Sequence, residues 1–201
     1  MRNLGLLAAV AILTGAICSG CAPSPGAKAT LLESMLVSPS EASAHGGWTV
    51  TAGTGPVDGD SADCSGKPFS WPKVKLIAHA SQFLDEGDDD SIAVIVKQLD
   101  GAAAADVTAL RAALKPCAPT AGVRLHGAML QPVGEDSFAY QSMGTDDTGE
   151  YTLDDTLIAC GHYEMEAIRI TYSSGRPDQA GVESVLHSAI RRMLKAGHCS
   201  D

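Results

Sequence analysis

Residues 150–172, EYTLDDTLIACGHYEMEAIRITY, contain two extended apolar segments on either side of Gly161 and His162. A glycine next to a polar residue is typical of a tight hairpin turn. The spacing therefore predicts two strands, over 150–160 and 163–172, that pair antiparallel across this turn.

Two further strands are predicted before this hairpin, over 123–131 and 136–143. Residues 146–149, DDTG, carry the polar and glycine residues of a second tight turn. Strands joined by such short links pair antiparallel, so we expect four antiparallel strands in the C-terminal half of the chain.

An earlier pair of strands is predicted from the alternating residues 73–80 and from the apolar segment 92–99. In the first of these strands, four residues are expected to share one buried face: Val74, Leu76, Ala78 and Ala80. The acidic residues 85–90 between the two segments predict a solvated hairpin tip. Residues 46–72 are rich in Gly, Asp and Ser and are expected to be irregular, apart from a short strand over 48–51.

Three helices are predicted from apolar residues at helical spacing, over 31–36, 102–115 and 177–197. Residues 38–41, SPSE, are expected to form a turn after the first helix, and Gly197 is expected to end the last one. The order of elements predicts an α+β fold in which an antiparallel β-sheet is covered by helices.

The N-terminus has the features of an export signal over residues 1–20: a basic residue at its start, a short apolar segment and small residues at its end. Residues 18–21, CSGC, resemble a bacterial lipobox, in which the last cysteine is diacylglycerated and becomes the mature N-terminus. We expect lipidation of Cys21, a lipidated N-terminus and flexible tether over 21–29, and a folded domain over 30–201 on the extracytoplasmic face of the cell membrane. An ordinary secretory signal with an incidental cysteine is the alternative.

The folded domain contains four cysteines: Cys64, Cys117, Cys160 and Cys199. An even number in an exported domain predicts two disulfides. Three connectivities are possible, and we favour Cys64 with Cys117 and Cys160 with Cys199, because each pair then joins residues within one half of the domain. A zinc site is not expected, because these four cysteines show no Cys-x-x-Cys spacing.

Charge and motifs exclude several classes of function. The formal net charge of -10 argues against a nucleic-acid partner, because phosphate binding needs clustered Lys and Arg. The common hydrolase and phosphate-loop motifs do not occur, so the sequence points to no catalytic residue and no cofactor. Their absence does not exclude an enzyme, because a triad can be assembled from distant positions.

A few residues are candidates for binding. Trp48 and Trp71 are the two tryptophans and could line a ligand cleft, although packing in the core is the alternative. His162, Glu164 and Glu166 would share one face of a continuous strand and could hold a metal, but a turn histidine followed by a solvent-facing strand is favoured.

Several short motifs occur in a recognisable order. GWTV over 47–50 follows a leucine-rich helix, LRAAL over 110–114 leads to Cys117, and a closing strand pair precedes a final helix. This order resembles the extracellular sensor domain of PknH-type mycobacterial Ser/Thr kinases, which also occurs in stand-alone actinobacterial lipoproteins.

The resemblance covers about residues 30–201 and implies a disulfide-linked, non-catalytic sensor or ligand-binding domain with a cleft. The expected partners are the membrane, through the lipid anchor, and an unknown small-molecule, glycan or lipid ligand or envelope protein. A cell-envelope hydrolase or transferase with a dispersed triad is the alternative.

Overall fold

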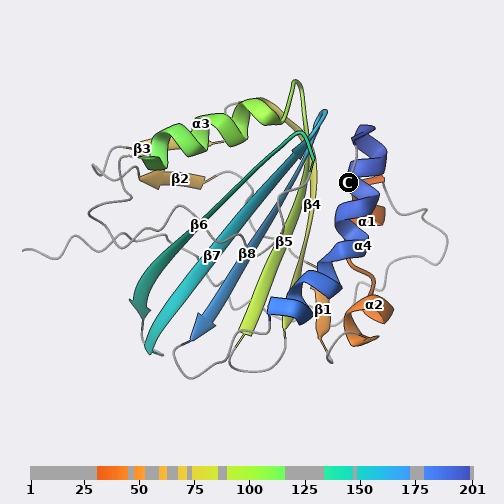
Figure 1. Cartoon of the computed structure of the whole chain (residues 1–201), viewed down its shortest axis with the longest axis vertical. Coiled ribbons are helices and arrows are strands. Elements are labelled where there is room, and N and C mark those ends of the chain that lie inside the picture. The colour runs from red at the N-terminus through yellow and green to blue at the C-terminus, as the bar shows by residue number, and fades with distance from the viewer. Residues whose placement is uncertain are drawn as a thin grey trace, which may run out of the picture.

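The computed structural model describes residues 31–44, 48–52, 59–62, 68–71, 74–85, 90–115, 134–146, 149–172 and 179–199. In these ranges the chain forms a 6-stranded antiparallel sheet in the order β1-β4-β5-β8-β7-β6, and a 2-stranded sheet, β2-β3 (Figure 1). The strands are β1 (Thr49–Ala52), β2 (Gly59–Ala62), β3 (Pro68–Trp71), β4 (Leu76–Asp85), β5 (Asp90–Leu99), β6 (Asp136–Asp146), β7 (Gly149–Cys160) and β8 (Tyr163–Tyr172). The helices are α1 (Leu31–Met35), α2 (Pro39–Ala44), α3 (Ala104–Leu114) and α4 (Gln179–Gly197).

The predicted α+β class is confirmed, and the predicted hairpin strands pair antiparallel. β4 runs on to Asp85 rather than ending at residue 80, and residues 86–89 of the predicted acidic tip lie outside the described residues. β7 and β8 pair from Tyr151 opposite Tyr172 to Cys160 opposite Tyr163, and Gly161 turns the chain between them with a φ of 57°. A left-handed backbone of this kind favours glycine. The strand predicted over 123–131 lies outside the described residues. The expectation of an irregular segment over 46–72 is wrong in part, because β2 and β3 form an antiparallel pair there.

Helices pack on both faces of the large sheet, and each face has its own hydrophobic cluster (Figure 1). α1, α2 and α4 cover one face, where Leu84, Val94 and Met165 contact the apolar side of α4. α3 covers one end of the other face, where Val107 and Leu110 pack against Leu99, Phe138 and Leu157. No helix among the described residues is long and apolar enough to cross a membrane.

A β-bulge divides the face of β4 that was predicted to be continuous. Leu76 pairs with Leu99 but Ala78 pairs with Gln98, so Ile77 is an extra residue in the ladder. One extra residue exchanges the two faces of a strand. Val74 and Leu76 therefore pack with the α3 cluster, whereas Ala78 and Ala80 pack with the α4 cluster. The prediction that all four share one face is wrong for this reason.

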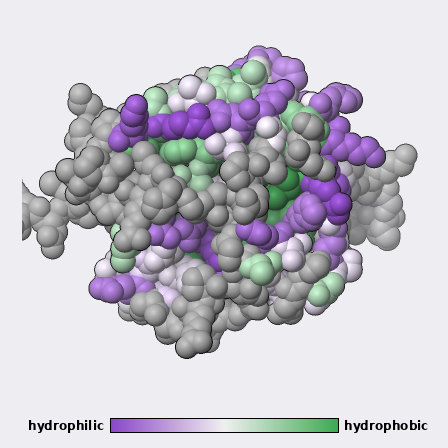
Figure 2. Space-filling view, viewed as in Figure 1, coloured by the Kyte–Doolittle hydropathy of each residue, from purple (hydrophilic) through white to green (hydrophobic). Residues whose placement is uncertain are grey.

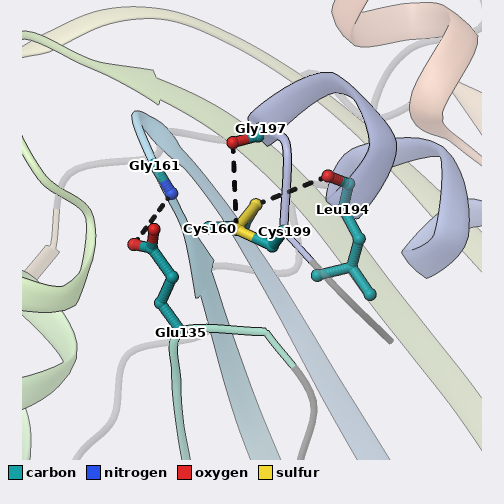
Figure 3. Close-up of a disulfide and its surroundings, with 6 residues drawn as sticks. All are labelled: Glu135, Cys160, Gly161, Leu194, Gly197 and Cys199. Carbon is teal, nitrogen blue, oxygen red and sulfur yellow. Dashed lines mark hydrogen bonds between the residues drawn. A yellow bond between two sulfur atoms is a disulfide. The ribbon is translucent and has the colours of Figure 1, made fainter.

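A disulfide between Cys160 and Cys199 joins the end of β7 to the residues after α4, as predicted (Figure 3). α4 ends with the amide of Cys199 bonded to the Leu194 carbonyl at 2.9 Å and the amide of His198 bonded to the Lys195 carbonyl at 3.3 Å. These bonds form a Schellman motif, and its left-handed residue is His198, with a φ of 63°. Gly197 is the last helical residue rather than the residue that stops the helix. Cys64 and Cys117 lie outside the described residues.

Candidate ligand-binding groove

A groove with a volume of about 810 Å³ lies at the β4 side of the large sheet. One wall comes from residues 33–41, which contain the end of α1 and the start of α2. The other wall is formed by residues 79–82 of β4 and by Val50 of β1, and Arg192 of α4 completes the lining. In Figure 2, which has the view of Figure 1, hydrophobic side chains are visible between hydrophilic ones in the region of β4.

The first wall is held by a helix cap that was predicted only as a turn. The backbone amide of Ser38 donates to Oε2 of Glu41 at 2.7 Å, and the amide of Glu41 donates to Oγ of Ser38 at 3.2 Å. This reciprocal pair is a capping box, and Pro39 occupies the first helical position, where its missing N–H has no cost. SPSE is the sequence signature of such a cap, so the prediction of a simple turn overlooked a helix.

An ion pair ties the first wall to α4. Nη1 of Arg192 lies 2.8 Å from Oε1 of Glu41, and Nη2 lies 3.3 Å from Oε2. Nη2 also donates to the carbonyl oxygen of Leu36. The hydrogen bond from Arg192 is the main reason that the pKa of Glu41 falls from 4.5 to about 2, and the bonds from Ser38 lower it further. α1, α2 and α4 are therefore fastened together beside the groove.

A buried amide fastens the same wall to β4. With Nε2 of Gln82 facing the carbonyl of Val37, the Gln82 side chain donates to Val37 O at 3.0 Å and accepts from Val37 N–H at 2.9 Å. Both residues are buried, with Gln82 3% and Val37 3% exposed. A buried backbone N–H or C=O group needs a hydrogen-bond partner. The Gln82 side chain supplies both partners for Val37, as a neighbouring strand would.

The lining contains hydroxyl groups and one imidazole. Its hydroxyls belong to Ser34, Ser38 and Ser81, and His79 supplies its imidazole. Ser34 donates to the Leu31 carbonyl, and Ser38 caps α2. Among the described residues, no hydrogen bond joins a serine hydroxyl to His79, so the groove contains no nucleophile paired with a base there.

A cluster of buried charges lies on the opposite face of the sheet, which α3 covers in part. Nζ of Lys97 on β5 contacts Glu164 at 3.0 Å and Glu166 at 2.8 Å, both on β8. Lys97 and Glu164 are 0% exposed and Glu166 is 5% exposed. Glu164 and Glu166 share one strand face as predicted, but that face is buried rather than solvated. The prediction of a solvent-facing strand is therefore wrong here. The two carboxylates can be buried because the ammonium of Lys97 compensates their negative charge.

Burial and neighbouring charges shift the pKa values in this cluster. Burial raises the pKa of Glu164 to about 7; Lys97 opposes that shift and Glu166 adds to it. Burial alone would lower the pKa of Lys97, but Glu166 and Glu164 outweigh it and raise that pKa. Burial, with the nearby charge of Glu166, also raises the pKa of Asp155 well above its usual range.

The residues that the sequence singled out are only partly brought together. Trp48 is 2% exposed and belongs to the core cluster beneath α4, which is a packing position. Trp71 ends β3, and its side chain lies outside what the structure describes. Nδ1 of His162 lies 2.8 Å from the carbonyl oxygen of Gly101. Among the described residues, no three His, Cys, Asp or Glu side chains are placed so that they could hold one metal ion. Cys21 precedes the described residues.

These elements define an α+β domain whose antiparallel sheet is covered by helices on both faces. One solved structure that shares this fold is the crystal structure of the extracellular domain of PknH from Mycobacterium tuberculosis. The two match with a TM-score of 0.52 and 12% sequence identity, over 82% of this chain and 95% of that chain. No family model matches the sequence, and no curated protein matches it. The likeness supports the predicted resemblance at the level of the fold.

Proposed function

We propose that this chain is a non-catalytic sensor or ligand-binding domain that a lipid on Cys21 holds at the extracytoplasmic face of the cell membrane. The observation that carries the proposal is the fold, which matches a domain described as extracellular over 95% of that domain's length. The disulfide between Cys160 and Cys199 fits an oxidising compartment, since structural disulfides persist there and are rare in the cytosol.

The groove is the place where a ligand would bind. Its volume of about 810 Å³ falls in the range of small-molecule and cofactor sites, roughly 300–1,000 Å³. Its walls are fixed by the capping box, by the ion pair of Arg192 with Glu41 and by the Gln82 amide, so the site is largely formed before a ligand arrives. A preformed site binds without the cost of ordering its walls.

Mass spectrometry of the full chain purified from its native envelope tests the binding function. Wild type should retain a bound compound, His79→Trp should lose it because the larger ring fills the groove, and Lys75→Trp should keep it. His79 and Lys75 are both exposed, but only His79 lines the groove. Adding the compound at about 100 times its Kd should stabilise the wild type by about 2.7 kcal/mol. Equal retention by both variants, or turnover of the compound, would contradict the proposal.

Labelling with a fatty-acid probe tests the anchor separately. Wild type should incorporate the probe and Cys21→Ala should not, because the thiol of Cys21 is the acceptor in the proposed modification. A Cys18→Ala variant is the matched control, since Cys18 belongs to the same segment but would be removed with the signal. Equal labelling of wild type and Cys21→Ala would rule out this anchor.

A further inference from the structure

We propose that the buried charges around Lys97 form a pH-sensitive switch, which releases the N-terminal part of α3 from the sheet when the pH rises from slightly acidic to slightly basic values. The switch consists of Lys97 on β5, Glu164 and Glu166 on β8, and Asp155 on β7. All four side chains are buried, and they share the sheet face on which Leu157 packs against α3. The groove is not needed for this response to pH, which therefore goes beyond the proposed binding function.

The cluster brings three buried carboxyl groups to one ammonium group. Nζ of Lys97 contacts Oε1 of Glu164 at 3.0 Å and Oε2 of Glu166 at 2.8 Å. Within the described ranges, Oε2 of Glu164 and Oδ1 of Asp155 have no hydrogen-bond partner. An ionised carboxylate that is buried without compensation is strongly destabilised relative to its neutral form. One positive charge cannot compensate three negative ones, so the folded cluster favours at least one bound proton.

Glu164 is the carboxyl group that we expect to release this proton near neutral pH. Burial raises its pKa to about 7, whereas Asp155 and its hydrogen-bond partner Tyr140 are both raised in pKa well above their usual ranges. Glu164 returns to its ordinary pKa of 4.5 when water reaches it. Opening of the structure around Glu164 therefore releases a proton, and the opening is favoured as the pH rises.

Glu164 lies close to the N-terminal end of α3. The carbonyl oxygen of Gly161, three residues before Glu164, accepts the amide of Ala103 at 2.9 Å. Asp106 in the first turn of α3 is buried, and its charge contributes to the raised pKa of Glu164. Oδ1 of Asp106 also accepts the Val74 amide at 2.8 Å. Ionisation of Glu164 adds a second negative charge near Asp106, and the repulsion weakens the attachment of this end of α3.

The far end of α3 is attached by other groups. Arg111 forms an ion pair with Asp136 and donates to the carbonyl oxygen of Ser137 at 2.9 Å. Leu110 packs in the cluster of apolar residues beneath the helix. We therefore expect the release to be confined to residues 103–107.

Two exposed histidines lie near the cluster, and their effect must be separated from that of Glu164. His79 is opposite Lys97 in the register of β4 and β5, and His162 follows Gly161 in the turn between β7 and β8. Histidine ordinarily titrates near pH 6.5, so both positions need control variants. Glu135 is a carboxyl group at the same end of the sheet, where its Oε2 accepts the Gly161 amide at 3.1 Å.

Hydrogen exchange of the full chain in detergent tests the switch, once the rates are corrected for the intrinsic effect of pH. The protection factors of amides 103–107 should fall about tenfold between about pH 6 and pH 8, because the proton is held with a pKa of about 7 in the closed state and 4.5 in the open state. Exchange there should depend little on added urea, which identifies a local opening, whereas amides in the middle of α4 should depend strongly on urea.

Substitutions identify the group that titrates. Glu164→Gln should abolish the tenfold fall, whereas Glu150→Gln, at an exposed position on β7, should keep it. Asp106→Asn retains a hydrogen-bond acceptor but removes the opposing charge, so it should make the fall smaller and provides the test if Glu164→Gln does not fold. His79→Gln and His162→Gln should keep the fall.

Four results would overturn the proposed switch. They are equal protection of residues 103–107 at both pH values, a urea dependence there that equals that of α4, an unchanged fall in Glu164→Gln or in the Asp106→Asn substitute, and loss of the fall in either histidine variant. Binding of a compound in the groove is measured separately, so these results leave the proposed binding function untouched.

Discussion

Gly197, the last residue of α4, packs directly against Cys160 at the end of β7 (Figure 3). A Cβ on Gly197 would collide with Sγ of Cys160 and would lie 2.7 Å from the Cys160 carbonyl oxygen. Gly197 does not have a positive φ; the left-handed residue at this helix end is His198. Glycine is therefore required at 197 for the close approach of helix and strand, and not for its backbone freedom.

Gly197→Ala is expected to lower the free energy of unfolding by about 1–3 kcal/mol, because the added methyl group forces α4 away from β7. In an unconstrained helix the same change would be stabilising, by up to about 1 kcal/mol. Urea denaturation measures the difference. Lys195→Ala, at an exposed position in the same turn, should change stability by less than about 0.5 kcal/mol. A Gly197→Ala protein more stable than wild type would mean that the contact with Cys160 is absent.

Removal of the adjacent disulfide should have a larger effect. Cys160 and Cys199 are separated by 39 residues, and a loop of that length corresponds to roughly 4 kcal/mol in the chain-entropy model. The double variant Cys160→Ala with Cys199→Ala is expected to lose about 2–4 kcal/mol in denaturation experiments. Peptide mapping of the non-reduced wild type should show Cys160 joined to Cys199 and a separate peptide joining Cys64 to Cys117. A peptide joining Cys64 to Cys160 would contradict both pairings.

The sequence predicted the strands well where the turn residues and the apolar residues on either side of them indicate the same hairpin. The β7–β8 hairpin has its glycine in the turn and apolar residues on both strands, so its position and pairing followed from local pattern. The bulge at Ile77 could not be predicted in the same way. Alternation in 73–80 is interrupted at Ile77, an apolar residue at a position expected to be polar, but this does not by itself indicate a change of face. The change is evident only from the packing of Leu76 and Ala78 into different clusters on the two sides of the sheet.

The buried charges predict an unusual dependence of stability on pH. The pKa of Glu164 rises from 4.5 to about 7 on folding, so the folded protein holds a proton that the unfolded chain releases. This contribution is fully present below about pH 4.5 and is lost as the pH rises through about 7. Since one pKa unit corresponds to about 1.4 kcal/mol, the loss amounts to about 3 kcal/mol. The raised pKa of Asp155 acts in the same direction.

Glu164→Gln should therefore reduce the fall in stability between about pH 5 and pH 8, because glutamine stays neutral throughout. The free energy of unfolding from urea titrations at both pH values is the measurement. Glu150→Gln removes an exposed carboxylate on β7 and should leave the pH dependence unchanged. If Glu164→Gln has the same pH dependence as wild type, the Glu164 carboxyl does not titrate in this range.

The candidate groove could be predicted less well than the sheet. Its walls depend on contacts between Arg192 and Glu41, which are separated by 151 residues, and no local pattern reveals such a pair. The signal that was present is SPSE, which predicts the capping box and therefore α2. Gln82 is a polar residue at an inward-facing position of a strand, and only the position of Val37 explains why it can be buried.

Glu41→Gln should have the opposite dependence on pH from Glu164→Gln. The pKa of Glu41 is lowered from 4.5 to about 2, so the stability it contributes is present above about pH 4.5 and is lost as the pH falls through about 2. The side chains of Arg192 and Glu41 are 34% and 27% exposed, so solvent screening reduces the contribution to about 1 kcal/mol. Glutamine can still close the capping box with Ser38, and the change therefore isolates the charge. Glu41→Gln is expected to be less stable than wild type at pH 7, and the difference should shrink as the pH falls through about 2. A double-mutant cycle with Arg192→Gln should assign most of the loss at pH 7 to the pair. A coupling energy near zero would mean that Arg192 does not fasten α4 to this wall of the groove.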